Sequence, residues 1–189
     1  HLQTLSVEFC SDLTDAVLLQ IALGCPLIHT LNLRGCMELT NQGIMQMLPL
    51  LTLRSINLTG LSFDDDTLHA LATTQSHTLQ VAYIYSLDCK ISVDGVSKLL
   101  QLCTKLHTLE APITYIDWRQ VQALTTLTVA EGPLPSAQYL PSADTHFPNL
   151  QYLTVDSVCT ESDKSLFSND SVLQVQRNAP RLRKFKYEE

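Results

Sequence analysis

A repeated spacing of apolar residues constrains the fold of this chain more than any other feature of its sequence. The segment Leu2-x-x-Leu5-x-Val7-x-x-Cys10-x-x-Leu13-Thr14-Asp15 returns 26 residues later as Ile28-x-x-Leu31-x-Leu33-x-x-Cys36-x-x-Leu39-Thr40-Asn41. The same frame starts again at Leu53, Leu79, Leu106, Leu124, Leu150 and Leu182. One such unit cannot bury its own apolar face, so neighbouring units must stack and share a continuous core.

Each unit predicts a strand followed by a helix. The apolar residues first alternate, as in a half-buried strand, and then recur at spacings of three and four, as in a helix. Thr14, Thr40, Ser92 and one of Asp64 or Asp65 stand where an N-cap oxygen would satisfy the free amides of the first helical turn. Apolar sets such as Val17, Leu18, Ile21 and Ala22 would form the buried helix face. These patterns indicate an α/β solenoid.

Three motifs connect the chain with a known repeat family. They are Cys-Ser-Asp-Leu-Thr-Asp at 10–15, Ile-Ala-Leu-Gly-Cys-Pro at 21–26 and Leu-Asn-Leu-Arg-Gly-Cys-Met-Glu-Leu-Thr at 31–40. The sequence resembles the cysteine-containing leucine-rich repeats of F-box/LRR proteins. This resemblance implies a right-handed leucine-rich-repeat solenoid, with a parallel strand row on the concave face and helices on the convex face. Residues 1–189 would then be one section of a longer array, with about eight strand units, regular over 1–110 and irregular over 111–189.

Charge and hydropathy exclude some classes of partner. The chain has 12 Lys and Arg against 19 Asp and Glu, a net charge of −7, which disfavours non-specific binding to nucleic acid or anionic membranes. No apolar run is long enough to cross a bilayer, and residues 1–20 do not have the pattern of a signal peptide. We therefore expect no nucleic-acid and no membrane partner. A local exception is the basic stretch 177–186, which we expect to divide between a helix end and a final strand.

The cysteines and histidines are explained by the repeat. Cys10 and Cys36 occupy equivalent positions, as do Cys25 and Cys103, so we predict buried thiols that pack as small apolar groups in a reducing cytoplasm or nucleus. A Cys-x-x-x-His spacing occurs twice, at 25–29 and 103–107, but without the four ligands of a tetrahedral metal site. The sequence contains no nucleophile elbow and no phosphate-binding loop. We predict no metal, no cofactor and no enzymatic activity.

The strand row offers a candidate binding surface. Side chains alternate across a strand, so the third, fifth and seventh positions of each unit would face the concave side. Most of these residues are small and hydroxylated: Thr4, Ser6, Glu8; Thr30, Asn32, Arg34; Ser55, Asn57, Thr59; Val81, Tyr83, Tyr85; Thr108, Glu110, Pro112; Thr126, Thr128, Ala130; Tyr152, Thr154 and Asp156.

The central unit differs from its neighbours because Val81, Tyr83 and Tyr85 form an apolar and aromatic strip. Tyr and Arg are enriched among the residues that dominate protein interfaces. The candidate protein-binding residues are therefore Tyr83, Tyr85, Val81, Arg34, Asn57, Glu110 and Tyr152. The alternative is that the stretch Ala130–Pro148, or further repeats, cover these rings. Trp118 lies in the shortest spacing between units, so we expect it to fill the core.

The function that the resemblance implies is recruitment of proteins. F-box/LRR proteins use the concave repeat surface to bind substrates for ubiquitination. The chain would then be the substrate-recognition section of an SCF-type ubiquitin ligase receptor, whose adaptor and cullin bind only through a segment outside these residues. A leucine-rich-repeat scaffold subunit without ligase function remains an alternative. So does a secreted recognition repeat, because Asn57-Leu-Thr and Asn169-Asp-Ser are glycosylation sequons.

Overall fold

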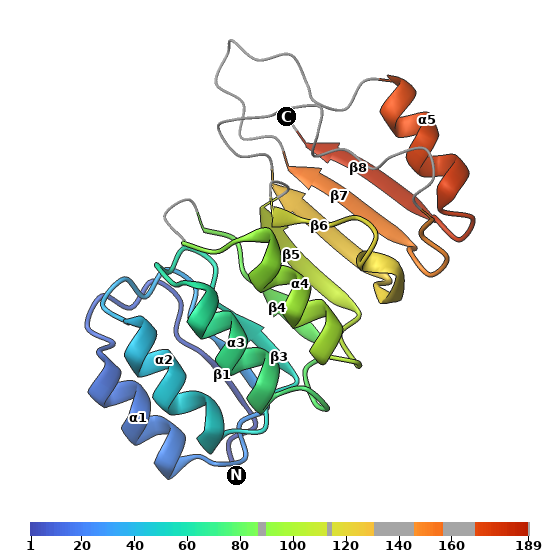
Figure 1. The fold of residues 1–189 in the computed structure, drawn as a ribbon. Helices are drawn as coiled ribbons and strands as arrows, with labels where there is room; N and C mark the ends of the chain where they lie inside the picture. The colour runs from blue at the N-terminus through green and yellow to red at the C-terminus, as the bar shows by residue number, and fades with distance from the viewer. Residues whose placement is uncertain (87–89, 113–114, 131–145, 157–168, 189) are drawn as a thin grey trace.

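Eight parallel strands form one row that runs the length of the molecule (Figure 1). The structure is a computed structural model and describes residues 1–86, 90–112, 115–130, 146–156 and 169–188. The strands pair strictly in sequence order, from β1 to β8. They are β1 (Thr4–Ser6), β2 (Thr30–Asn32), β3 (Ser55–Asn57), β4 (Val81–Tyr83), β5 (Thr108–Pro112), β6 (Thr126–Ala130), β7 (Tyr152–Asp156) and β8 (Lys184–Glu188).

The helices lie on one face of this row (Figure 1). Helices α1 to α4 follow strands β1 to β4 and pack side by side, and α5 lies beside β8 at the other end. The helical segments are α1 (Asp15–Gly24), α2 (Asn41–Met47), the 3-10 turn η1 (Leu48–Leu50), α3 (Asp65–Thr74), α4 (Val93–Leu102), the 3-10 turn η3 (Val121–Ala123) and α5 (Asn169–Asn178). The predicted α/β solenoid of the leucine-rich-repeat type, with parallel strands alternating with helices, is confirmed.

The core lies between the strand row and the helices. The second residue of each strand from β2 to β7 points into it, and none of these side chains is more than 1% exposed. These residues are Leu31, Ile56, Ala82, Leu109, Leu127 and Leu153. Each is the second apolar residue of a predicted frame, so the alternation in the sequence assigned the correct face to every one of these strands.

Carboxylates join the helix N-termini of successive units. Asp15, the first residue of α1, accepts hydrogen bonds from the backbone amide and hydroxyl of Thr40, at 2.9 and 2.6 Å. Asp65, the first residue of α3, accepts the same pair from Ser92, at 2.8 and 2.6 Å. Thr40 and Ser92 are the N-caps of α2 and α4, so each carboxylate holds the cap of the following helix. We call these contacts the cap bridges.

Each carboxylate cap bridge depends on a glycine in the following helix. A Cβ at Gly43 of α2 would overlap the carboxylate of Asp15, and a Cβ at Gly95 of α4 would overlap that of Asp65. Glycine at these positions therefore provides the space into which the carboxylate fits. Neither glycine has the positive φ that would otherwise require this residue type.

Between α2 and α3 a similar bridge is made with the donor and acceptor roles exchanged. The N-cap of α3 is Asp64, which resolves the choice that the sequence left open between Asp64 and Asp65. The first residue of α2 is Asn41, whose amide donates to Asp64 at 2.5 Å and accepts from the hydroxyl of Thr67 at 3.1 Å. An asparagine avoids the repulsion that two adjacent carboxylates would create.

The C-terminal part of the solenoid is held differently. The spacing of 18 residues between Leu106 and Leu124 leaves too little chain for a strand and a full helix, and the turn η3 takes the place of the helix. Trp118 fills this junction, is 5% exposed and meets Phe147 edge to face, with the ring centroids 5.8 Å apart. The predicted core role of Trp118 is confirmed.

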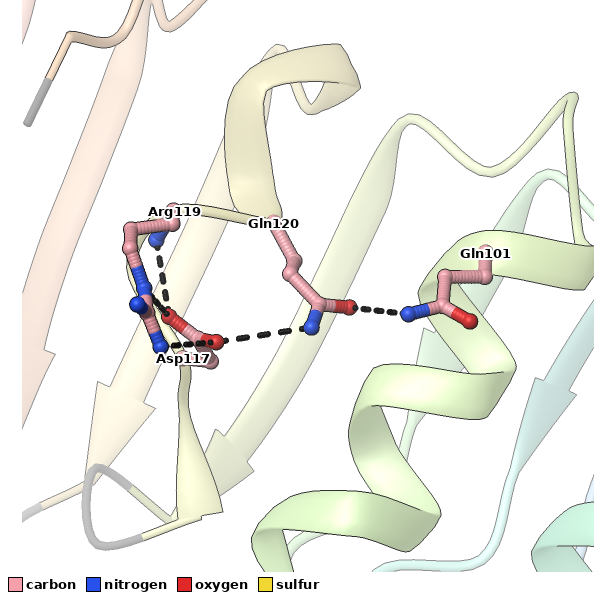
Figure 2. A network of polar contacts seen from close by, with 4 residues as sticks. All are labelled: Gln101, Asp117, Arg119 and Gln120. Atoms are coloured by element: carbon pink, nitrogen blue, oxygen red, sulfur yellow. Dashed lines mark hydrogen bonds and ion pairs between the residues drawn. The ribbon is translucent and has the colours of Figure 1, made fainter.

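A polar network links α4 to this irregular segment (Figure 2). Gln101 of α4 donates to Gln120 at 3.1 Å, and Gln120 donates to Asp117 at 3.4 Å. Arg119 binds the same carboxylate through its Nε and a terminal nitrogen, each at 3.0 Å. Hydrogen bonding by Arg119, together with its charge, lowers the pKa of Asp117 against the opposing effect of partial burial.

Several sequence expectations are wrong. Thr14 precedes α1 at the N-cap position, but its side chain makes no cap hydrogen bond, and Cys25 is only half-buried. Cys10 is exposed although its equivalent Cys36 is buried, and Val17 on α1 is 45% exposed. Both belong to the first unit, over which no earlier unit packs in this structure. Pro112, expected on the concave side, is buried where β5 enters the irregular junction. The division into regular repeats over 1–110 and irregular repeats over 111–189, within one section of a longer array, stays a prediction.

Candidate binding face

One face of the strand row is covered by the helices, and the opposite face is not (Figure 1). The side chains that alternate with the core residues belong to this opposite face. We call it the open face. In the second and third units these side chains are half-buried or exposed, whereas the residues between them are buried. The predicted alternation therefore places Thr30, Asn32, Ser55 and Asn57 on this face.

At the N-terminal end, short polar contacts order the open face. Asn32 donates to Glu8 at 2.8 Å, and the hydroxyl of Ser6 donates to the same carboxylate oxygen at 3.2 Å. The side-chain oxygen of Asn32 also accepts from the backbone amide of Arg34 at 3.1 Å. The guanidinium carbon of Arg34 lies 5.6 Å from the centre of the Phe9 ring, within the range of a cation–π contact.

In the centre, strand pairing brings three of the predicted site residues together. Asn57 of β3 is the register partner of Tyr83 of β4, which in turn pairs with Glu110 of β5. Asn57 is held in place because its side-chain oxygen accepts from the amide of Thr59 at 2.9 Å. Tyr83 is half-buried, so part of this residue is accessible to solvent. An amide, a phenol and a carboxylate thus lie side by side in one row.

The other predicted residues differ in position and exposure. Val81 is half-buried and lies two residues before Tyr83 on β4, where it pairs with Thr108 rather than with Glu110. Tyr85 is half-buried and its hydroxyl oxygen is buried, so less of its polar end than expected is available to a partner. Arg34 follows β2, two strands from Tyr83, and Tyr152 of β7 lies three strands away on the other side, with 40% of its surface exposed. The structure therefore gathers Asn57, Tyr83 and Glu110 but leaves Arg34 and Tyr152 apart.

Sequence reasoning missed Phe9 as an exposed aromatic residue. Its side chain is 67% exposed, and its backbone has φ of 54°, a left-handed conformation that side chains other than glycine rarely adopt. Gly35 and Gly60 occupy the equivalent positions and also have positive φ. The replacement of a repeated glycine by an aromatic residue was the signal available in the sequence.

The thiols and histidines of the described ranges do not form a reactive centre. Burial raises the pKa of Cys103 to about 12 and also raises the pKa of Cys36, so both thiols stay protonated at neutral pH. Nδ1 of His29 lies 3.2 Å from the hydroxyl of Thr30, and Nδ1 of His107 lies 3.0 Å from that of Thr108. No three His, Cys, Asp or Glu residues of the described part of the chain are placed to hold a metal. Cys89 and Cys159 lie outside it.

Comparisons with known proteins do not assign the chain to a family. No family model and no curated protein matches the sequence. Among solved structures, the chain is similar to one in the crystal structure of the Rad7 and Elc1 complex in yeast, with 14% identity and a TM-score of 0.41, over 96% of this chain and 68% of that one. The fold assignment rests on the strand order and core described above. Within the ranges the structure covers, no helix is both long and apolar enough to span a membrane.

Proposed function

We propose that this chain is a protein-binding module whose partner contacts the open face. The observation that carries the proposal is the row Asn57, Tyr83 and Glu110, which the parallel register brings together on the side of the strands away from the core. Half-buried aromatic residues beside fixed polar groups are characteristic of the residues that dominate protein interfaces. Cys36 and Cys103 are buried, and burial raises the pKa of both thiols, so neither is available as a nucleophile.

The finer proposal is that the partner is a substrate for ubiquitination. The support is the resemblance of the motifs at 10–15, 21–26 and 31–40 to the repeats of F-box/LRR proteins. In this role the chain is the substrate-recognition section of an SCF-type receptor, and Tyr83 is the central anchor. The adaptor and cullin bind through a segment outside these residues. Arg34, Tyr85, Val81 and Tyr152 extend the contact.

The second candidate is a scaffold subunit that assembles a complex without a ligase. The same open face supports it, because a parallel row of short strands offers a partner the same side chains whatever the outcome of binding. Both roles place the chain in the cytoplasm or nucleus. Cys10, Cys25, Cys36 and Cys103 are free thiols, as a reducing compartment requires. A thiol titration of the native protein that finds all six cysteines free would exclude the secreted alternative.

Affinity capture with the full parent protein, followed by mass spectrometry, tests these roles. We expect a cullin, its adaptor and a client protein, and we expect loss of the client alone when Tyr83→Ala is combined with Tyr85→Ala. Thermal melting of the double variant checks its fold, because the buried hydroxyl of Tyr85 connects that residue with the interior. His69→Ala, an exposed position on α3, is the matched control. A stable complex without cullin supports the scaffold, and a client bound equally by the double variant contradicts the open face as the site.

A further inference from the structure

The two rims of the strand row differ in charge. Because all strands are parallel, their first residues lie along one rim and their last residues along the other. In the first four units, the segments from strand to helix carry eight acids and two bases, at 7–15, 33–41, 58–66, 84–86 and 90–94. The segments from helix to strand carry two bases and no acid, at 23–29, 48–54, 74–80 and 102–107. We call the rim formed by these last four segments the entry rim. An anionic partner is attracted to the entry rim and repelled by the opposite one.

Helix termini account for the acidic rim but not for the bases of the entry rim. Asp15, Asp65 and Asp94 lie in first helical turns, where carboxylates stabilise the positive end of the helix dipole. A cation in the last turn would stabilise the negative end in the same way, yet α1 to α4 have none there. The two bases of the entry rim, Arg54 and Lys105, instead lie one and three residues before β3 and β5. Their positions therefore do not serve the helix dipoles.

Backbone hydrogen bonds hold the residues that precede the strands in one row. The amide of Arg54 donates to the carbonyl of His29 at 2.7 Å, and the amide of Gln80 donates to that of Arg54 at 2.8 Å. The amide of His107 donates in turn to the carbonyl of Gln80 at 3.0 Å. Neighbouring strands lie about 4.8 Å apart, so the backbones of Arg54 and His107, two strands apart, are separated by about 10 Å. The register thus aligns a guanidinium, an amide and an imidazole residue along the entry rim.

The cations of the entry rim are available to a partner. Arg54 and Lys105 are exposed, and within the described ranges no hydrogen bond or ion pair engages either side chain. Elsewhere Lys98 pairs with Asp94 at 2.7 Å, and Arg119 binds a neighbouring carboxylate at 3.0 Å. A partner can therefore bind Arg54 and Lys105 without the loss of an existing contact.

We propose that the entry rim binds an acidic segment of a partner protein. Carboxylates of the segment pair with Arg54 and Lys105, and its polar groups form hydrogen bonds with Gln80 and His107. Neutral residues separate the two cations, which suits individually spaced carboxylates better than the continuous charge of a nucleic-acid backbone. The entry rim is a different surface from the open face, so this inference goes beyond the proposed function and does not depend on it.

Fluorescence anisotropy of a labelled peptide in which glutamates alternate with serines tests the proposal, and a peptide with glutamine in place of glutamate is its control. The unchanged protein is expected to bind only the glutamate peptide, and NaCl is expected to weaken binding because exposed charges are screened. R54E combined with K105E is expected to weaken binding about tenfold or more, since attraction becomes repulsion. K90E combined with K98E is the matched control, because it makes the same change in net charge at two exposed lysines outside the entry rim.

Several results would overturn the proposal. They are no binding of the glutamate peptide, equal binding of the glutamine peptide, or equal losses of affinity in the two double variants. A single-stranded oligonucleotide that binds as tightly, and is released by the same charge reversal, shows general attraction of anions and also overturns it. Circular dichroism checks that the charge-reversed protein is folded, and R54Q with K105Q provides a milder second variant that is expected to weaken binding less.

Sedimentation velocity examines another occupant, the acidic rim of a second copy of this chain. We expect the protein to sediment in the same way with and without R54E and K105E. Self-association that this double variant abolishes would mean that the entry rim joins copies of the chain, and the proposed partner segment would be wrong.

Tyr83→Ala separates this inference from the proposed function. We expect this variant to bind the glutamate peptide as the unchanged protein does. Loss of peptide binding would place the acidic segment on the open face and overturn only the entry rim. Peptide binding that depends on Arg54 and Lys105, without a Tyr83-dependent client, contradicts only the open face.

Discussion

Strands β1 to β4 are three residues long, whereas strands β5 to β8 are five residues long. The first four strands are followed by helices α1 to α4, which stack and are joined by the cap bridges. Between β5 and β6 the helix is reduced to the three-residue turn η3, and Trp118 with Phe147 fills the space. One strand row is thus stabilised in two ways. In the first region, which has a helix after every strand, the cap bridges order the helix layer. In the second region, where a helix is missing, longer strand pairing and aromatic packing take the place of the cap bridges.

The largest expected effect concerns the aromatic packing of the second region. Trp118→Ala removes a side chain that is 5% exposed, and we expect a loss of about 3–5 kcal/mol in the free energy of unfolding. Denaturant unfolding measures it. Phe9→Ala is the matched control in the first region, where removal of a ring that is 67% exposed is expected to cost about 0.5 kcal/mol or less. Equal losses from the two substitutions would show that Trp118 does not hold the irregular junction.

A smaller effect tests the space that the cap bridges need. Gly43→Ala places a Cβ against the carboxylate of Asp15, so we expect a loss of about 1–3 kcal/mol. Gly24→Ala is the control, because a Cβ there meets nothing within 4 Å and the change is expected to stabilise the protein by about 0.5–1 kcal/mol. Thermal melting of both variants gives the difference. If Gly43→Ala is also stabilising, the cap bridge does not contribute to the folded state.

The smallest effect tests the exchanged donor and acceptor roles in the bridge between α2 and α3. Asn41→Asp replaces a donor to Asp64 by a second carboxylate, and we expect a loss of about 1–2 kcal/mol at neutral pH. The loss requires that both carboxylates are ionised, so it is expected to shrink as the pH falls towards about 4, the usual range of carboxyl groups. Urea unfolding at several pH values measures the trend. A loss that does not change with pH would mean that the lost hydrogen bond, not charge repulsion, sets the cost.

The sequence predicts most of the fold because one repeated pattern determines it. All eight frame starts, from Leu2 to Leu182, precede a strand, and the core position of strands β2 to β7 follows from alternation. The helix caps at Thr40, Asp64 and Ser92 were also visible, since residue types that cap helices recur at the same place in each unit.

Other features depend on contacts that no single unit contains. The fit of Asp15 against Gly43 joins residues of two units, and so does the role of Gln75. Gln75 is 1% exposed, accepts from the amide of Leu53 at 2.8 Å and donates to the carbonyl of Leu48 at 2.8 Å, so it holds the turn η1 of the unit before it. The exposure of Cys10 is likewise a property of the end of the row. Periodicity within a unit cannot show any of these.

The candidate site was predicted in part. Register brings Asn57, Tyr83 and Glu110 together as alternation implied, because equivalent positions of a parallel row align. The burial of the Tyr85 hydroxyl was not foreseen, because it depends on a side-chain conformation that the repeat pattern does not specify. The exposure of Phe9 was also missed, although the aromatic residue at a repeated glycine position was visible in the sequence. The basic stretch 177–186 divides between the last turn of α5 and β8, as the charge cluster and the repeat frame predicted.

The most direct test of the central claim is the affinity of the captured client for the Tyr83→Ala and His69→Ala variants, with the melting temperature of each. We expect Tyr83→Ala to weaken binding about tenfold or more, as truncation of an interface anchor does, and to leave melting nearly unchanged. We expect His69→Ala to leave both unchanged. Equal affinities for the two variants would contradict the claim that the open face is the binding surface.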